Sequence, residues 1–332
     1  MTEIGLIGPQ SIRLLIGVGV FLAAATVVAE IMFRRTTKEG LRNTLSNVRQ
    51  RIFAWWIMVG VLAVSLALGE TVLLVLFMLL SLVALREFMA LVPAGEKDGR
   101  ALIWIMAVLT PLHYWFIWQH WYGMFAIFIP VYAFLFLPVL LALSGRTDHF
   151  LHRAALSQWG LMVCVYALSH LPAVLQLPVA FNEGKSAADG SPVGSGGVAG
   201  GALLLFVCVV VQGSDVLQYL WGKTLGRHKI APNVSPNKTW EGFIGGVLSA
   251  TALGAALWWL TPFTPWQAAL LSLIACLMGF VGGLVMSSLK RDRGIKDFGA
   301  IIPGHGGILD RTDSLIFAAP VFFHMTRFFF SG

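Results

Sequence analysis

Charged side chains are scarce in this 332-residue sequence. Asp, Glu, Lys and Arg make up 12% of it, whereas 57% of the residues are hydrophobic. Soluble domains carry about 25% charged and about 45–50% apolar residues. The mean hydropathy is +0.79. This composition excludes an ordinary soluble protein and predicts an all-α, polytopic integral membrane protein.

Several patterns are also missing. The three cysteines lie in apolar runs without disulfide or metal-ligand spacing, so we expect them to be buried apolar side chains. No small-residue cleavage site follows the first apolar run, which ends at Arg34 and Arg35, and we therefore expect no cleavable signal peptide. Neither a Walker A loop nor an inverted repeat of the two halves is present, which argues against a P-loop nucleotide site and a secondary transporter.

The apolar runs themselves predict about ten transmembrane helices, since a span needs about 20 apolar residues. The second and third runs touch at Gly69, which indicates either a tight hairpin or one element misread as two. The predicted spans are 11–33, 53–69, 71–93, 101–118, 124–144, 157–180, 201–221, 241–260, 266–288 and 313–330.

The distribution of positive charge predicts the orientation. With the N-terminus outside, five connections face the cytoplasm, and they hold 19 of the 23 Lys and Arg residues. Cytoplasmic loops carry such an excess of positive charge, so we expect a multi-pass protein of the inner (cytoplasmic) membrane with its polar C-terminal loops inside. The five connections are 34–52, 94–100, 145–156, 222–240 and 289–312.

Three regions follow from composition. Residues 1–180 form N-terminal, lipid-facing scaffold helices, 181–200 a flexible Gly/Ser-rich loop, and 201–332 a catalytic transmembrane domain. In the first region, the basic loop 34–52 either sets the topology or binds anionic lipid headgroups. Glu87, beside Arg86 at the end of the third span, is either a functional carboxylate or half of a snorkelling pair.

The window 287–313 concentrates charge between two apolar runs, with five cations and four carboxylates. Asp310 and Asp313 are three residues apart at the start of the last span and share a helix face. Helix capping explains one of them, and two carboxylates holding Mg²⁺ beside substrate phosphates explain both. His305, between glycines, either contacts a phosphate or caps the turn.

Two further stretches carry polar groups. Asp215 lies inside the seventh span on the same face as Gln218, where a carboxylate requires a cation or metal partner unless it reaches the headgroups. The loop 222–242 offers lysines and an arginine for phosphates. Its segment from Ser235 to Glu241 also reads as a helix start, with Ser or Thr caps and Pro in the first turn.

The order of these residues closely resembles that of the CDP-diacylglycerol synthase (phosphatidate cytidylyltransferase) family. The resemblance covers about residues 201–332. It rests on Ser287, Lys290, Arg291, Lys296, Asp297, Gly299, Pro303, His305, Gly306, Gly307, Asp310, Arg311 and Asp313, with a second hallmark from Ser235 to Gly242 and a third in Asp215, Tyr219 and Gly222.

The resemblance implies an integral-membrane nucleotidyltransferase that transfers CMP from CTP to phosphatidate, giving CDP-diacylglycerol and pyrophosphate at the cytoplasmic face. It implies Mg²⁺, leaves a second ion such as K⁺ open, and implies a homodimer in the membrane with no nucleic-acid partner. The implied roles are metal binding by Asp215, Asp310 and Asp313, catalysis by Lys290, Arg291, Lys296, Asp297, His305 and Arg311, and substrate binding by Ser235, Lys238, Thr239, Glu241 and Ser287.

The sequence departs from the family at three positions. The family carries Gly-Asp four residues before the Ser of the signature, and its Asp ligates metal, but here the pair is Gly282 and Gly283. Gln218 stands where Ala is common, and Asn237 where Lys is common. Either Asp215 or water replaces the missing carboxylate, or the chain is a divergent relative that has an altered lipid substrate or acts as an inactive membrane scaffold.

Overall fold

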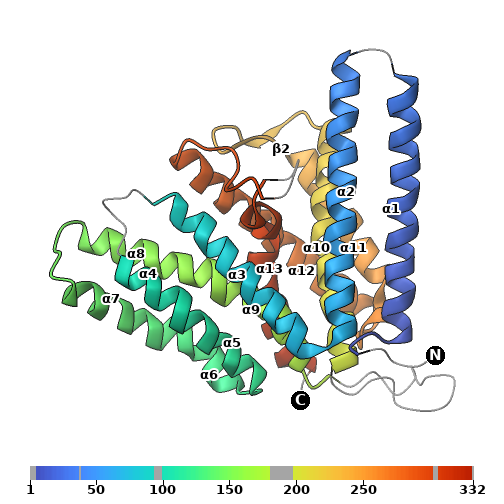
Figure 1. Cartoon of the computed structure of the whole chain (residues 1–332). Coiled ribbons are helices and arrows are strands. Elements are labelled where there is room, and N and C mark those ends of the chain that lie inside the picture. Colours follow the sequence, from blue (N-terminus) through green and yellow to red (C-terminus); the bar gives the residue numbers. More distant parts are fainter. Residues whose placement is uncertain (1–4, 37–38, 93–98, 180–196, 302–305, 331–332) are drawn as a thin grey trace.

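The computed structural model describes residues 5–36, 39–92, 99–179, 197–301 and 306–330, and nearly all of them are helical (Figure 1). The uninterrupted helices are α1 (Pro9–Arg35), α2 (Glu39–Leu68), α3 (Glu70–Ala90), α10 (Gly197–Leu225), α11 (Trp240–Ala256), α12 (Pro265–Asp292) and α13 (Ile308–Phe330).

Three further helical runs contain short π or 3₁₀ segments. The first joins α4 (Gly99–Trp104), η2 (Ile105–Leu109) and α5 (Thr110–Trp118). The second joins α6 (Tyr122–Ile127), η3 (Phe128–Ala133) and α7 (Phe134–Leu143). The third joins α8 (Phe150–Leu161), η4 (Met162–Ala167), α9 (Leu168–Ala173) and η5 (Val174–Gln176); a separate 3₁₀ turn, η6 (Trp258–Leu260), follows α11.

These ten helical runs overlap the ten predicted spans, so the prediction of an all-α polytopic membrane protein is confirmed. The bounds differ most at α2, which begins at Glu39, so most of the predicted basic loop 34–52 is helical. Seven helices among the described residues have the length and apolar composition of a membrane span. Helices satisfy every backbone group internally, which the bilayer requires. Gly69, with φ of 105°, separates α2 from α3, so the touching runs are two helices joined by one residue. The predicted loop 181–200 falls largely outside the described residues.

Helix α10 is the centre of the C-terminal part, where it packs against α11, α12 and α13. Small residues permit the close approach: a Cβ at Gly246 would overlap Gln218 of α10, and one at Gly254 would overlap Ser272 of α12. The hairpin of α1 and α2 stands at one edge of the molecule (Figure 1).

One element was not predicted. Strands β1 (Lys229–Ala231) and β2 (Ser235–Thr239) form an antiparallel hairpin between α10 and α11. The expected helix start was therefore partly wrong: Pro236 lies in β2 and not in a first helical turn. Thr239 is the N-cap, and its Oγ1 accepts a hydrogen bond from Gly242 N at 3.2 Å. Proline is tolerated there because a two-stranded hairpin has only edge strands.

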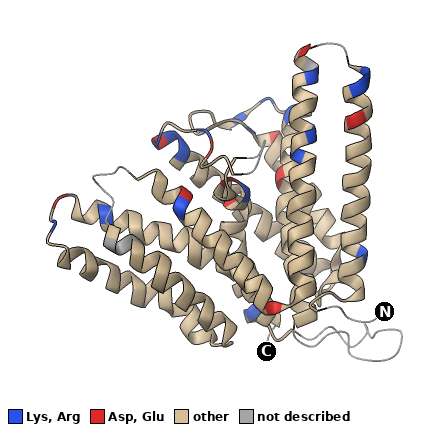
Figure 2. Ribbon diagram, viewed as in Figure 1, with Lys and Arg blue, Asp and Glu red and all other residues tan. Residues whose placement is uncertain are grey.

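Most charged residues gather on one side of the molecule, at the β hairpin, the end of α12 and the connection between α1 and α2 (Figure 2). The ends of the chain lie on the opposite side (Figure 1). This arrangement brings the polar segments of the C-terminal half to one surface, as the predicted topology requires.

Candidate functional site

Four elements meet at the charged side of the C-terminal part. Asp215 of α10, Lys238 of β2, Lys290 of α12 and Asp313 of α13 lie within electrostatic range of one another. Residues 23 to 98 positions apart in sequence thus share one site. The two polar segments and the last helix converge on it.

Asp310 organises the loop before α13. This carboxylate is buried, and its Oδ1 accepts a bond from Lys290 Nζ at 3.0 Å. Its Oδ2 accepts bonds from Phe298 N at 2.7 Å and Gly307 N at 2.9 Å. Both oxygens are therefore engaged, and Asp310 couples the ammonium of Lys290 to the start of α13.

The carboxylates of Asp313 and Asp215 accept fewer hydrogen bonds from the protein than that of Asp310. Asp313 Oδ1 accepts a bond from the adjacent Ser314 N at 2.8 Å. Asp313 interacts electrostatically with Lys290, Lys238 and Arg311, and Asp215 interacts with Lys238 and Arg311. Asp215 and Asp313 are thus surrounded by cationic side chains. At such a site a metal ion can replace one of these side chains beside the carboxylates, or a phosphate can bind to the side chains.

Lys238 reaches into the site from β2. Its ammonium lies 4.6 Å from the centre of the Phe280 ring and makes a long hydrogen bond of 3.4 Å to Phe280 O. Burial lowers the pKa of Lys238, and Lys290 lowers it further, whereas Asp215 and Asp313 act to raise it. Lys238 is thus a partly desolvated cation, and a bound anion would stabilise its charge.

Gly283 provides the space that Lys238 occupies. A Cβ placed on Gly283 would lie 2.8 Å from Lys238 Nζ. At the position where the family carries a carboxylate, this chain therefore places an ammonium group. Gly283 in place of Asp therefore replaces a negative charge by the positive charge of Lys238 at this point of the site.

The residues present fit one divalent cation and no preformed cluster. In the described part of the chain, no three His, Cys, Asp or Glu residues are arranged to hold a metal ion. Asp310 accepts three bonds from the protein, so Asp215 and Asp313 are the more accessible carboxylate ligands of the three predicted ones. Mg²⁺ is commonly held by one or two carboxylates together with water and substrate phosphates, so this pair is sufficient.

Other predicted residues shape the walls of the site. Arg291 Nε donates to Val234 O at 3.2 Å and Nη1 to Ile295 O at 3.3 Å, joining the β hairpin to the loop after α12. Ser287 Oγ donates to Gly283 O at 2.6 Å within α12. These bonds hold the backbone that carries Lys238 and Lys290.

Glu241 closes the loop before β1. Its Oε2 accepts a bond from Arg227 N at 3.0 Å, and its Oε1 lies 2.6 Å from His228 Nδ1. Thr239 caps α11, and Ser235 pairs with Ala231 in the hairpin. In this arrangement the three predicted substrate-binding residues form the scaffold of the loop.

The remaining predicted residues are less constrained. Lys296 and Asp297 are exposed in the loop between α12 and α13. Arg311 is half-buried, and its Nε is a buried donor without a hydrogen-bond partner in the described structure. His305 lies outside the described residues.

One residue has a role that the sequence did not reveal. Glu87, at the end of α3, is 6% exposed, and its carboxylate accepts bonds from Ile308 N at 3.0 Å and Leu309 N at 2.9 Å. Gly299 and Gly307 pack so closely against it that neither has room for a Cβ. Glu87 therefore caps the helix that carries Asp310 and Asp313, a role that neither sequence alternative described. The sequence signal, a lone Glu at a span end, did not reveal a partner 221 residues away.

Comparisons with known proteins show similarity over most of the chain. The model of the Cytidylyltransferase family matches residues 49–329. The chain is 38% identical over 312 residues to an uncharacterized protein, YnbB, of Escherichia coli (strain K12), covering 92% of this chain and 95% of that protein.

Shorter matches come from proteins named phosphatidate cytidylyltransferase. One from Staphylococcus aureus (strain COL) is 44% identical over 120 residues, which are 36% of this chain and 46% of that protein. One from Mycobacterium leprae (strain TN) is 45% identical over 126 residues, which are 37% of this chain and 39% of that protein. The matches thus span less than half the length of these named relatives.

Proposed function

This chain belongs to the cytidylyltransferase family, and on that premise we propose that it transfers CMP from CTP to phosphatidate. The products are CDP-diacylglycerol and pyrophosphate, and the reaction takes place at the cytoplasmic face of the inner membrane. The observation that carries the proposal is the meeting of Lys238 and Lys290 with Asp215 and Asp313 at the charged end of apolar helices. There a water-soluble polyphosphate and a lipid headgroup can both reach the same cations.

The reaction requires charge neutralisation more than proton transfer. An oxygen of the phosphatidate monoester attacks the α-phosphorus of CTP, and the bond from that phosphorus to the bridging oxygen of the β-phosphate breaks. The attacking group is already an anion near neutral pH, so a strong base is unnecessary. The barrier comes from bringing two polyanions together and from charge that develops on pyrophosphate.

The position of each side chain in the site indicates its role in binding the phosphates or the metal. Lys238, Lys290 and Arg311 bind phosphate oxygens, and the buried Arg311 Nε supplies a donor that the described structure leaves unused. Asp215 and Asp313, together with Asp310, would hold Mg²⁺, whose charge would neutralise that of the phosphates. Asp310 keeps Lys290 in place through the 3.0 Å ion pair. The catalytic roles predicted for Lys296, Asp297 and His305 stay part of the proposal. A homodimer and a second ion such as K⁺ stay predictions.

One observation favours a second candidate. The ammonium of Lys238 lies where a carboxylate would project from position 283, which is consistent with a relative that binds a nucleotide without turning it over or that accepts another lipid phosphate. In that case the chain acts as a membrane scaffold or on a different acceptor.

Turnover by the purified protein separates these functions. Detergent-solubilised protein is incubated with CTP, Mg²⁺ and phosphatidate, and pyrophosphate and the liponucleotide are both measured. Formation of both in equal amounts supports the proposed function. CTP binding without either product supports the second candidate, and no CTP binding rejects both.

A further inference from the structure

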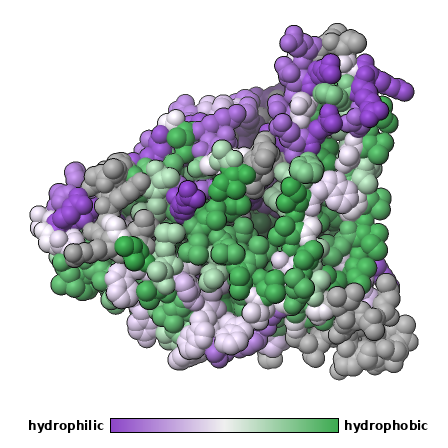
Figure 3. All heavy atoms as spheres, in the orientation of Figure 1, coloured by the Kyte–Doolittle hydropathy of each residue, from purple (hydrophilic) through white to green (hydrophobic). Residues whose placement is uncertain are grey.

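The hairpin of α1 and α2 has little contact with the rest of the protein on its outer surface. Val20, Phe21 and Phe53 are each more than 60% exposed, which suits contact with acyl chains. Its charged end lies on the same side as the candidate site, and Figure 3 shows this end as hydrophilic above a hydrophobic surface. The end therefore lies at the level of lipid headgroups.

Two arginines pair with one carboxylate at this end, and a third arginine stacks on the same aromatic ring as one of them. Glu30 Oε1 accepts a bond from Arg34 Nε at 2.7 Å, and Glu30 Oε2 is paired with Arg49 Nη2 at 3.1 Å. The guanidinium carbons of Arg49 and Arg42 lie 4.5 Å and 5.0 Å from the centre of the Phe33 ring. The cluster holds three positive charges against one negative charge.

Fold stability does not account for this cluster. The side chains of Arg34 and Arg49 are 77% and 43% exposed, and exposed pairs contribute little to stability. Cations held close together repel one another, and stacking on one aromatic ring fixes two of them in place. An anion bound between them would relieve the repulsion.

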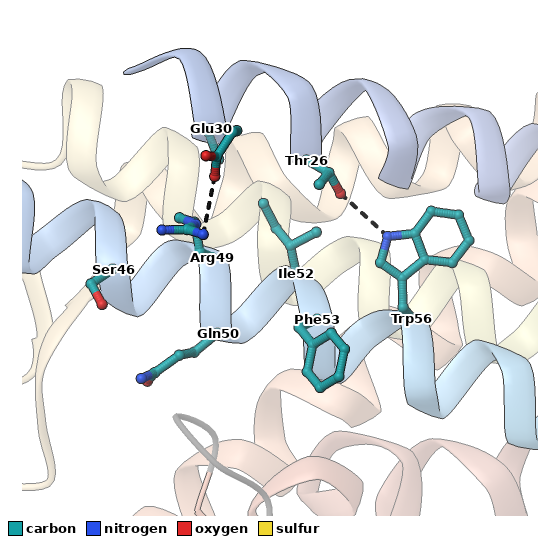
Figure 4. A pocket seen from close by; sticks show the side chains of 9 residues that line it. Thr26, Glu30, Ser46, Arg49, Gln50, Ile52, Phe53 and Trp56 are labelled. Atoms are coloured by element: carbon teal, nitrogen blue, oxygen red, sulfur yellow. Dashed lines mark hydrogen bonds and ion pairs between the residues drawn. The ribbon is translucent and has the colours of Figure 1, made fainter. Parts of the chain in front are cut away.

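A cleft of about 450 Å³ opens between α1 and α2 beside Arg49 (Figure 4). Ser46 and Gln50 line its outer end, and Ile52, Phe53 and Trp56 line the end toward the bilayer. Trp56 Nε1 donates to Thr26 Oγ1 at 3.3 Å across the cleft. The lining thus changes from polar to apolar along α2, as in a site for an amphiphile with an anionic head.

We propose that this cleft binds one anionic glycerophospholipid. Its phosphate lies against Arg49, which lines the cleft, and against Arg42, which stacks on the same Phe33 ring beside it. Gln50 and Ser46 are further donors, and an acyl chain runs along Phe53 and Trp56. A soluble phosphate would use only the outer end, whereas a neutral lipid would leave the three arginines uncompensated. The site involves none of the residues assigned to CTP, so it stands independently of the proposed function.

Lipid binding to purified full-length protein in detergent tests this assignment. Native mass spectrometry measures retention of phosphatidylglycerol and of phosphatidylcholine. The double variant Arg42→Gln/Arg49→Gln is compared with Arg35→Gln/Arg51→Gln, which removes the same charge from the same hairpin outside the cluster. Phosphatidylglycerol binding is expected to weaken about tenfold in the cluster variant and to stay near wild type in the control.

Two further measurements test whether a folding defect causes the loss of binding and whether the site binds a soluble phosphate in place of a lipid. Glu30→Gln keeps an acceptor for the arginines but removes the competing charge, so it is expected to tighten phosphatidylglycerol binding. Glycerol 3-phosphate is expected not to displace the lipid. Equal losses in both double variants, no loss in either, weaker binding in Glu30→Gln, or displacement by glycerol 3-phosphate would each overturn the proposal.

Discussion

Replacing Glu87 by Gln tests whether the N-terminal helices hold the candidate site in place. The substitution keeps the side-chain shape but removes the charge that receives the N–H groups of Ile308 and Leu309. The amide has one oxygen, so one of these two donors loses its acceptor and the other loses a charged one.

The magnitude follows from these bonds. A hydrogen bond to a charged group contributes about 1.5–3 kcal/mol, and a carboxylate at a helix N-terminus contributes about 0.3–1 kcal/mol more. We therefore expect Glu87→Gln to cost about 2–3 kcal/mol at the start of α13. If this cost falls on the placement of Asp313 during turnover, the rate of pyrophosphate release drops about 30- to 160-fold.

The assay combines turnover with thermal unfolding in the same detergent. Arg86→Gln is the matched control, because Arg86 is the exposed neighbour of the buried Glu87 on α3, and it is expected to behave like wild type. A larger effect on turnover than on unfolding identifies Glu87 as a positioning residue. Wild-type turnover and unfolding in Glu87→Gln would refute the capping argument.

The other predictions concern the site itself. Asp313→Asn is expected to abolish Mg²⁺-dependent pyrophosphate release and to weaken Mn²⁺ binding measured by electron paramagnetic resonance; near wild-type values in both would remove Asp313 from the metal site. Gly283→Ala adds a Cβ that displaces Lys238 Nζ, so KM for CTP is expected to rise about tenfold, and an unchanged KM would show that Lys238 does not contact CTP. Because burial lowers the pKa of Lys238, this cation loses its charge at a lower pH than an ordinary lysine, and KM for CTP is expected to rise at a pH below the ordinary lysine pKa of about 10.4. In Lys238→Arg, whose charge does not titrate there, this rise should vanish; its persistence would assign the titration to another group.

The residues that meet in the site were largely identifiable from the sequence. Asp215, Lys238, Lys290 and Asp313 are polar residues in or beside long apolar runs, where each such group is costly and requires a partner. The ordered motif identified the family. The same reasoning did not reveal which carboxylates remain free, because Asp310 is occupied by a lysine and two backbone N–H groups only after the loop folds back.

The sequence by itself determined the membrane class, the ten helical runs and the family, because these depend on local properties: apolar length, charge placement and an ordered motif. Tertiary structure alone decided that Glu87 caps α13, that Lys238 fills the space beside Gly283, and that Arg49 of α2 pairs with Glu30 of α1. Each of these contacts joins different secondary-structure elements. No periodicity or propensity encodes such pairs, because their geometry arises only when the helices and the hairpin pack together.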